Sequence, residues 1–361
     1  MKIFLVAGAR PNFMKIAPLI HELKRNGKED AWKLIHTGQH YDYEMSKAFF
    51  DDLDIPEPDH FLNVGSGTHA EQTAKVMIEF EKVCMKEKPD IIIVVGDVNS
   101  TLACSITAKK LHIKVAHVEA GLRSRDMSMP EEINRIITDS ISDYLFVTEE
   151  SAVENLRKEG KRDKQIFFVG NIMIDTLYYS LEKLKKIKPK TCAEGRNDFS
   201  YAVVTLHRPS NVDDEVKLKD ILNALSVISS ELKIYFPMHP RTRKNIDKFK
   251  LNNLLENITV VPPMPYLEFL TLWKDAALVL TDSGGIQEET TALGIPCFTI
   301  RNNTERPITI EEGTNTLVGT TIEGILNAYK EFKSGIKKEW KIPPLWDGKT
   351  AQRIIKLLLN K

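Results

Sequence analysis

The sequence predicts an α/β protein with two doubly wound domains, each built on a mostly parallel sheet. Three observations lead to this fold class. Short apolar, β-branched runs alternate with longer helical patterns, and the whole series occurs twice. Several runs, such as IIIVV at 91–95, lack polar alternation, as expected of strands buried on both faces. Between the two series, the polar and lysine-rich stretch 181–200 is typical of a connection between domains.

The first series predicts a strand at each of its apolar runs. Their ranges are 2–8, 32–38, 90–96, 114–120, 144–148 and 166–170. Stretches with helical periodicity separate these runs. In the first such stretch, NFMKIAPLIHELKRNG, the apolar residues share one broad face, Asn12 is suited to cap a helix and Gly27 is suited to end it.

The second series predicts strands in the same way. Their ranges are 201–207, 232–239, 258–263, 278–283, 297–300 and 316–319. The final stretch, GKTAQRIIKLLLNK, is predicted to form a single amphipathic helix. Ligands of such sheets bind at the carboxyl ends of the strands, and two facing domains are expected to form a cleft. Candidate site residues are therefore expected where strands end.

Composition excludes several classes of partner. The chain of 361 residues contains 50 Lys+Arg and 50 Asp+Glu, so its charge favours neither nucleic acid nor a membrane surface. Its four cysteines are widely spread and form no C-x-x-C pair, which argues against a zinc site and against disulfides. The apolar runs fall far short of the roughly 20 residues of a membrane span, and the first residues lack a secretory apolar region. We therefore expect a cytoplasmic protein without a metal.

Carboxylates follow two neighbouring strands of the first domain. Asp97 comes just past the strand at 90–96, where it is either a helix cap or a site residue. Glu119 follows His117 at the end of the next strand. A buried carboxylate there needs a cationic partner, for which Arg123 or Arg125 is available, or else a functional role. Both the structural and the functional interpretation stay open at this point.

A third candidate carboxylate lies in the stretch MPEEINR at 129–135. Pro130 suits the first turn of a helix, and Glu131 and Glu132 suit the positive end of the helix dipole. That account explains both glutamates without a function, so the pattern by itself is weak support for a site.

Cationic side chains also follow strands. Arg10 and Lys15 come after the first strand, and His207 and Arg208 end the first strand of the second domain. Arg306, in TERP, comes from a later junction of strand and loop. The fixed positive charges of Arg10 and Lys15 and the His207–Arg208 pair indicate an anionic ligand.

The strongest local pattern is TDSGGIQEETTALGIP at 281–296. Ser283, Gly284 and Gly285 precede a predicted helix, so an anion can approach the N–H groups of its first turn. Glu288 and Glu289 lie one to two turns further, within reach of ribose hydroxyls. The pattern matches neither G-x-G-x-x-G nor G-x-x-x-x-G-K-[ST]. It therefore indicates a nucleoside diphosphate without pointing to NAD or ATP.

Together these motifs resemble the non-hydrolysing UDP-N-acetylglucosamine 2-epimerases nearly from end to end. The motifs that carry the resemblance are GARPNFMKIAPL (8–19), TGQH (37–40), GDVNS (96–100), HVEAGLRS (117–124), PEEINR (130–135), LHRPSNV (206–212), DSGGIQEE (282–289) and TERP (304–307). The resemblance implies the GT-B fold with a cleft between two Rossmann-like domains. These would be 1–172, completed by the C-terminal helix 347–361, and a UDP-binding domain at 198–346.

The resemblance also implies a reaction. An isomerase of this family eliminates UDP to leave a 2-acetamidoglucal and adds UDP back with C2 inverted, supplying UDP-N-acetylmannosamine for cell-surface polysaccharides. It implies no cofactor, and it implies a homodimer. By motif position, the catalytic residues would be Asp97, Glu119, Glu131 and His207. The substrate-binding residues would be Arg10, Lys15, Asp97, Glu119, His207, Arg208, Phe269, Ser283, Gly284, Gly285, Glu289 and Arg306.

Within that set, Ser283, Gly284 and Gly285 would hold the diphosphate, Glu289 the ribose, and Phe269 would lie on the uracil side. Four hypotheses about function stay open. The protein is an epimerase, a hydrolysing relative that releases UDP and N-acetylmannosamine, a GT-B glycosyltransferase or a nucleotide-sugar sensor. A 2-epimerase of a related UDP-2-acetamido sugar is a variant of the first. The concentration of acid–base carboxylates speaks against the transferase and the sensor.

Overall fold

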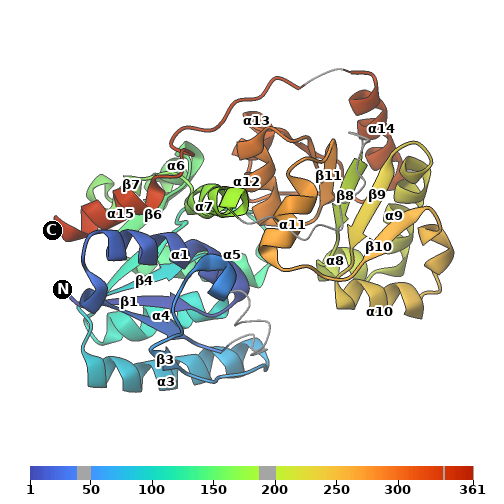
Figure 1. Cartoon of the computed structure of the whole chain (residues 1–361). Coiled ribbons are helices and arrows are strands. Elements are labelled where there is room, and N and C mark those ends of the chain that lie inside the picture. The colour runs from blue at the N-terminus through green and yellow to red at the C-terminus, as the bar shows by residue number, and fades with distance from the viewer. Residues whose placement is uncertain (39–49, 187–200, 336–337, 361) are drawn as a thin grey trace. The chain divides into compact units, whose positions relative to one another are not determined.

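Two compact units make up the protein. The computed structural model describes residues 1–38, 50–186, 201–335 and 338–360. The first unit consists of Met1–Ser180 and Pro344–Lys361, and the second of Leu181–Pro343. The motif residues Gln39 and His40 lie outside the described residues. Each unit is a parallel sheet flanked by helices, which confirms the predicted fold class (Figure 1).

The described part of unit 1 holds a seven-stranded sheet in the order β3-β2-β1-β4-β5-β6-β7, and every pairing in it is parallel. The strands are β1 (Ile3–Ala7), β2 (Trp32–His36), β3 (His60–Phe61), β4 (Ile91–Val95), β5 (Lys114–Val118), β6 (Tyr144–Val147) and β7 (Ile166–Phe168). The helices are α1 (Arg10–Arg25), α3 (His69–Glu87), α4 (Asn99–Lys110), α5 (Pro130–Ile141), α6 (Glu150–Lys158), α7 (Ile172–Lys186) and α15 (Thr350–Leu359). Short 3-10 turns lie at Glu29–Ala31 and Asp163–Gln165.

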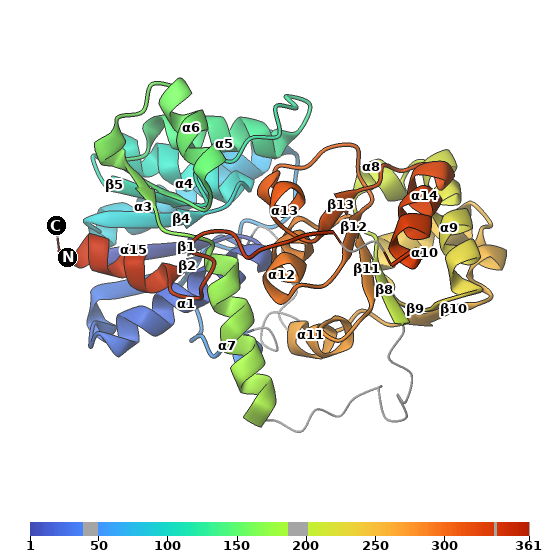
Figure 2. The same ribbon diagram turned by 90° about the horizontal axis from the view of Figure 1, so that it is seen from above.

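Helices cover both faces of this sheet. Phe4 and Val6 of β1 pack with apolar residues of α3 and α4 in one buried cluster. On the opposite face lie α1 and, beside it, the C-terminal helix α15 (Figure 2). The first turn of α15 is fixed by Asp175 of α7, whose carboxylate accepts hydrogen bonds from the N–H groups of Thr350 (3.1 Å) and Ala351 (2.7 Å). The end of the chain therefore completes unit 1.

The described part of unit 2 holds a six-stranded parallel sheet in the order β10-β9-β8-β11-β12-β13. The strands are β8 (Tyr201–Thr205), β9 (Lys233–Pro237), β10 (Ile258–Val261), β11 (Leu278–Thr281), β12 (Cys297–Thr299) and β13 (Asn315–Leu317). The helices are α8 (Pro209–Val212), α9 (Glu215–Ser229), α10 (Pro240–Lys248), α11 (Tyr266–Trp273), α12 (Gly284–Leu293), α13 (Ile308–Glu311) and α14 (Ile322–Lys333), and a 3-10 turn lies at Asn252–Leu255. Residues of α9, α10 and α14 form the core on one face, and α11, α12 and α13 lie on the other (Figure 1).

Each predicted strand overlaps an observed one, and the two-residue strand β3 was not predicted. Asn12 does not cap α1, because this helix begins at Arg10. Instead the Oδ1 of Asn12 reaches back and accepts hydrogen bonds from the N–H groups of Gly8 and Ala9, both at 3.0 Å. The stretch 181–200 was predicted as a connection, but 181–186 continue α7 and the rest lies outside the described residues. Nowhere in the described ranges is a helix both long and apolar enough to cross a membrane.

Candidate active site

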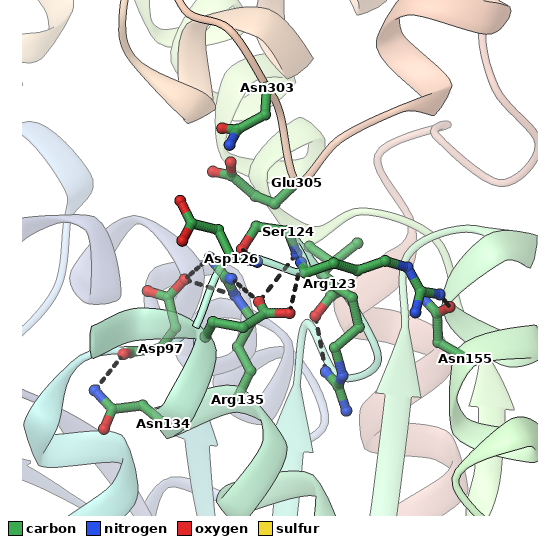
Figure 3. Close-up of polar contacts among 12 residues, drawn as sticks. Asp97, Arg123, Ser124, Asp126, Asn134, Arg135, Asn155, Asn303 and Glu305 are labelled. Carbon is green, nitrogen blue, oxygen red and sulfur yellow. Dashed lines mark hydrogen bonds and ion pairs between the residues drawn. The ribbon is translucent and has the colours of Figure 1, made fainter. Parts of the chain in front are cut away.

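The carboxylate of Asp97 is held by an arginine. Its Oδ2 accepts hydrogen bonds from Nε (3.0 Å) and Nη2 (2.7 Å) of Arg135, as Figure 3 shows. Its main-chain oxygen accepts a further bond from the side chain of Asn134 at 2.8 Å. The interpretation of Asp97 as a helix cap is wrong, because α4 begins at Asn99 and Val98 occupies the cap position. The side chain is 25% exposed, so this ion pair is open to a ligand.

Asp97 and Glu131 line one cavity of about 300 Å³ in unit 1. The other lining residues are Ser66, Gly67, His69, Gln72, Val98, Asn99, Pro130 and Asn134. Pro130 begins α5, as predicted, and Glu131 follows it as an exposed residue of the first turn. Two of the predicted carboxylates, from different elements, therefore face the same space.

The third carboxylate, Glu119, is buried and paired with Lys15 of α1. Both residues are at most 6% exposed, and Lys15 Nζ forms an ion pair with Glu119 Oε2. Gly96 makes room for this pair, since a Cβ on it would lie 2.9 Å from Lys15 Nζ. Glu119 itself has a φ of +75°, a strained conformation for a non-glycine residue. Strain of this kind persists only where the surroundings impose it, and here the buried ion pair does so.

The predicted partners of Glu119 were wrong. Arg123 pairs instead with Asp139 (2.8 Å) and Glu159 (2.6 Å). The guanidinium of Arg125 donates to Asn155 Oδ1 at 2.8 Å. Both arginines follow Glu119 by a few residues, but the chain turns away after β5, and the cation that reaches Glu119 comes from a distant helix. Arg10, at the start of that helix, is exposed.

His117 is fully buried and has a structural role, because both of its ring nitrogens contact neighbouring residues. Its Nδ1 lies 2.6 Å from Asp139 Oδ1 and its Nε2 lies 2.8 Å from the main-chain oxygen of Gly96. Both ring nitrogens of His117 therefore face an oxygen atom of a neighbouring residue. Burial alone would raise the pKa of Asp139, but His117 and Arg123 outweigh it and lower that pKa. The contact of His117 Nε2 with the main-chain oxygen of Gly96 thereby fixes the peptide that precedes Asp97.

In unit 2, His207 forms a dyad with Asp282. His207 Nδ1 lies 2.9 Å from Asp282 Oδ1, and the N–H groups of His207 (3.0 Å) and Arg208 (2.9 Å) donate to Asp282 Oδ2. Asp282 is fully buried, which by itself would raise its pKa, but these contacts lower it. The His207 side chain is 45% exposed, and Nδ1 is engaged, so Nε2 is the nitrogen left to meet a ligand. Asp282 was not predicted as a site residue, although its position directly before Ser283, Gly284 and Gly285 could have indicated it.

The glycine-rich start of α12 lies against Arg306. Ser283 is the N-cap residue of α12, and Gly284 is its first helical residue. A Cβ on Gly284 would lie 2.7 Å from Arg306 Nη1, so only glycine allows the guanidinium this close to the helix start. Arg306 is 7% exposed and is held by Glu288 at 2.8 Å and by Glu305. The structure thus brings together the predicted diphosphate turn and one of the predicted cations.

Glu289 lies deeper in α12, where it is 2% exposed. Burial, reinforced by the neighbouring Glu288, raises the pKa of Glu289 to about 8, although the hydroxyl of Tyr266 donates to Oε1 at 2.6 Å. Tyr266, which the sequence did not indicate, begins α11, and the half-buried Phe269 lies on the same helix. The hydroxyl of Tyr266 therefore connects α11 to the second turn of α12.

The raised pKa of Glu289 predicts a pH-dependent stability. The ordinary value is 4.5 and the folded value about 8, so the folded state binds this proton more tightly. That contribution is fully present below about pH 4.5 and is lost as the pH rises through about 8. We expect the thermal unfolding midpoint to fall more steeply with pH in the wild type than in Glu289→Gln. The control is Glu323→Gln, at an exposed position of α14, whose unfolding midpoint should change with pH as that of the wild type does. The prediction would be contradicted if the midpoint of Glu289→Gln changed with pH in parallel with the wild type.

Among the described residues, no group of three His, Cys, Asp or Glu side chains is placed to hold a metal ion. Cys84, Cys104 and Cys297 are buried and free.

Comparison with known proteins identifies relatives along the whole chain. The sequence model of the UDP-N-acetylglucosamine 2-epimerases matches residues 21–359. A UDP-N-acetylglucosamine 2-epimerase of Methanocaldococcus jannaschii is 45% identical over 366 residues, 99% of each chain. A UDP-2,3-diacetamido-2,3-dideoxy-D-glucuronate 2-epimerase of Pseudomonas aeruginosa is 41% identical over 91% of each chain.

Solved structures agree with these relatives. The crystal structure of the Methanocaldococcus jannaschii UDP-GlcNAc 2-epimerase in complex with UDP-GlcNAc and UDP matches with a TM-score of 0.90 and 44% identity, over 100% of both chains. The UDP-GlcNAc 2-epimerase of Neisseria meningitidis bound to UDP-GlcNAc matches with a TM-score of 0.90 and 31% identity, again over 100% of both chains.

Proposed function

This chain belongs to the UDP-N-acetylglucosamine 2-epimerase family, and on that premise we propose that it interconverts UDP-N-acetylglucosamine and UDP-N-acetylmannosamine without hydrolysis. A base removes the proton from C2, the electron pair forms the C1=C2 double bond, and the C1–O bond to UDP breaks. UDP then adds back to C1 of the 2-acetamidoglucal, while an acid delivers a proton to the opposite face of C2. Atoms and charges balance without any oxidant, reductant or cofactor.

One observation carries this proposal: Asp97 and Glu131 line the same cavity. Inversion at C2 needs a proton acceptor and a proton donor, and two carboxyl groups facing one space supply both. The ion pair with Arg135 favours the ionised form of Asp97, which is the form that accepts a proton. In the reverse direction the two groups exchange tasks.

The remaining predicted residues have roles around this chemistry. We assign Glu119 and Lys15 to the sugar, with Glu119 as the third acid–base carboxylate. The ring of His207, which Asp282 holds through Nδ1, would donate a hydrogen bond from Nε2 to the departing diphosphate. In unit 2, the diphosphate would be bound by Arg208, Ser283, Gly284, Gly285 and Arg306, and Arg10 of unit 1 stays a predicted substrate-binding residue. Glu289 would accept hydrogen bonds from the ribose, and Phe269 would contact the uracil. A homodimer, a cytoplasmic location and a supply of polysaccharide precursors stay predictions.

Two alternatives keep the same elimination step. In a hydrolysing enzyme, water adds to the glycal, and free UDP and N-acetylmannosamine accumulate. Phosphorus NMR of a reaction with UDP-N-acetylglucosamine separates these outcomes: the proposal predicts signals of two UDP-sugars, and free UDP that rises to completion would replace it with the hydrolysing reaction. The second alternative is another UDP-2-acetamido sugar, since a 41% identical relative is named for a diacetamido uronate. A panel of UDP-sugars in the same assay decides the substrate.

The assignment of the diphosphate predicts the effect of Gly284→Ala. The added Cβ would push against Arg306 Nη1 at 2.7 Å and Glu305 Oε1 at 3.0 Å, displacing the cation from the helix start. We expect the Kd for UDP to rise about tenfold, equal to ~1.4 kcal/mol, with the Kd for uridine unchanged. Isothermal titration calorimetry with both ligands measures this. Equal losses for UDP and uridine would contradict a specific effect on the diphosphate.

A further inference from the structure

Arg135 lies between two carboxylates in unit 1. It is 3% exposed and belongs to the second turn of α5. Its Nε and Nη2 bond Asp97 Oδ2 at 3.0 and 2.7 Å, and its Nη1 bonds Glu132 Oε2 at 2.6 Å. Figure 3 shows the guanidinium of Arg135 pointing toward Asp97. Three of its nitrogens are thus engaged, which fixes the plane of the guanidinium.

Glu132 in turn is fixed by the loop that follows β5. Its two carboxylate oxygens accept hydrogen bonds from the N–H groups of Ser124 (3.0 Å) and Arg125 (2.9 Å). It is 1% exposed, and burial alone would raise its pKa, yet these N–H groups and Arg135 lower it. A buried, ionised Glu132 cannot move without breaking backbone contacts. It is therefore a rigid support for Arg135, and the dipole account of Glu132 is incomplete.

We propose that Arg135 is a positioning residue for proton transfer at Asp97: supported by Glu132, it fixes the direction of the Asp97 carboxylate and keeps it ionised. The inference rests on the proposed function, in which Asp97 is an acid–base group. Arg135 is the last residue of the motif PEEINR, but no role was predicted for it from the sequence. An arginine suits the task because its planar fork can bond two carboxylates at once, which a lysine ammonium cannot do in a fixed geometry.

The charges around Asp97 explain why a cation is needed. Glu131 lines the same cavity, so two carboxylates face one space, and like charges favour protonation. His69, at the start of α3, also lines the cavity, and its Nδ1 lies 3.1 Å from Asn99 Nδ2. The negative charge of Glu132 is largely satisfied by backbone N–H groups. Arg135 is a cation that balances Asp97 at contact distance, with Nη2 2.7 Å from Oδ2.

The test compares Arg135→Lys with Arg125→Lys. Lysine keeps the charge at position 135 and lets the protein fold, but it loses the forked geometry. Arg125 contributes only its N–H to Glu132 and bonds Asn155 through its side chain, so Arg125→Lys is the matched control. We expect Arg135→Lys to lower kcat about 10- to 100-fold with the Kd for UDP within about twofold, and to move the acidic limb of the pH–rate profile to higher pH. Arg125→Lys should retain the wild-type rate and profile.

Carbon NMR of the Asp97 carboxyl, assigned with Asp97→Asn, gives a readout that does not need turnover. The inference predicts that Asp97 titrates at higher pH in Arg135→Lys than in the wild type. If it does so in a protein that epimerises no UDP-sugar, the proposed function fails, while the finding that Arg135 keeps the Asp97 carboxylate ionised stands. An unchanged titration, or an unchanged kcat and pH profile in an active enzyme, would overturn the positioning role. Equal losses of kcat in both variants would overturn it as well, because they would indicate a general effect on the loop.

Discussion

Asp97→Asn is expected to lower kcat about 10³-fold or more while the Kd for UDP changes by less than about threefold. Asparagine keeps the shape of the side chain and still accepts hydrogen bonds from Arg135, so the fold and the cavity are retained. The amide of asparagine cannot accept the proton that leaves C2 of the sugar, however, so the acid–base pair with Glu131 is lost. Steady-state rates from the phosphorus NMR assay and calorimetric titration with UDP measure both quantities.

The control for this variant is Asp163→Asn. Asp163 is an exposed aspartate whose carboxylate pairs with Arg157 at 2.8 Å on the surface, so its replacement should leave kcat and stability nearly unchanged. If Asp97→Asn turned over at the wild-type rate, Asp97 would be a structural partner of Arg135, and the acid–base assignment would have to move to Glu119 and Glu131.

Lys15→Met should destabilise unit 1 by about 3–5 kcal/mol, the usual cost of removing one partner of a buried ion pair. Lys15 and Glu119 are 8% and 5% exposed at their side chains, so the remaining carboxylate would lie uncompensated in the interior. Urea denaturation monitored by circular dichroism measures the loss.

Two further variants separate this effect from a general loss of packing. Lys15→Met combined with Glu119→Gln removes the buried charge along with its partner, so we expect part of the stability to return. Lys82→Met removes a lysine whose pair with Glu79, at 2.7 Å, is exposed on α3, and it should cost less than about 1 kcal/mol. A double variant as unstable as the sum of its two single variants would argue that Lys15 and Glu119 act independently.

The fold could be predicted because its signals are local. Buried parallel strands read as continuous apolar runs, and helices between them show their periodicity within a few turns, so every predicted strand overlaps an observed one. The short strand β3 escaped because His60 and Phe61 carry no periodic signal. The boundary of α1 was misplaced because an asparagine also suits the third helical position, from which its side chain reaches back to the N–H groups that precede the helix.

The candidate site was only partly predictable. Asp97 and Glu119 stand at strand ends, where parallel topology gathers side chains at one edge of the sheet, and motif position added Glu131. Their partners could not be predicted, because Lys15 reaches Glu119, and Arg135 reaches Asp97, only once the helices are packed. Nearby arginines in the sequence were misleading for this reason. Tyr266 was hidden in the same way, since its contact with Glu289 joins separate helices.

The central claim is reversible epimerisation at C2, and proton NMR in heavy water tests it most directly. Purified protein is incubated with UDP-N-acetylglucosamine, and the anomeric and C2 proton signals are followed over time. The account predicts that UDP-N-acetylmannosamine appears, that the two UDP-sugars reach a steady ratio, and that deuterium replaces the C2 proton in both. Epimerisation with the C2 proton retained would contradict the proton-transfer chemistry assigned to Asp97 and Glu131.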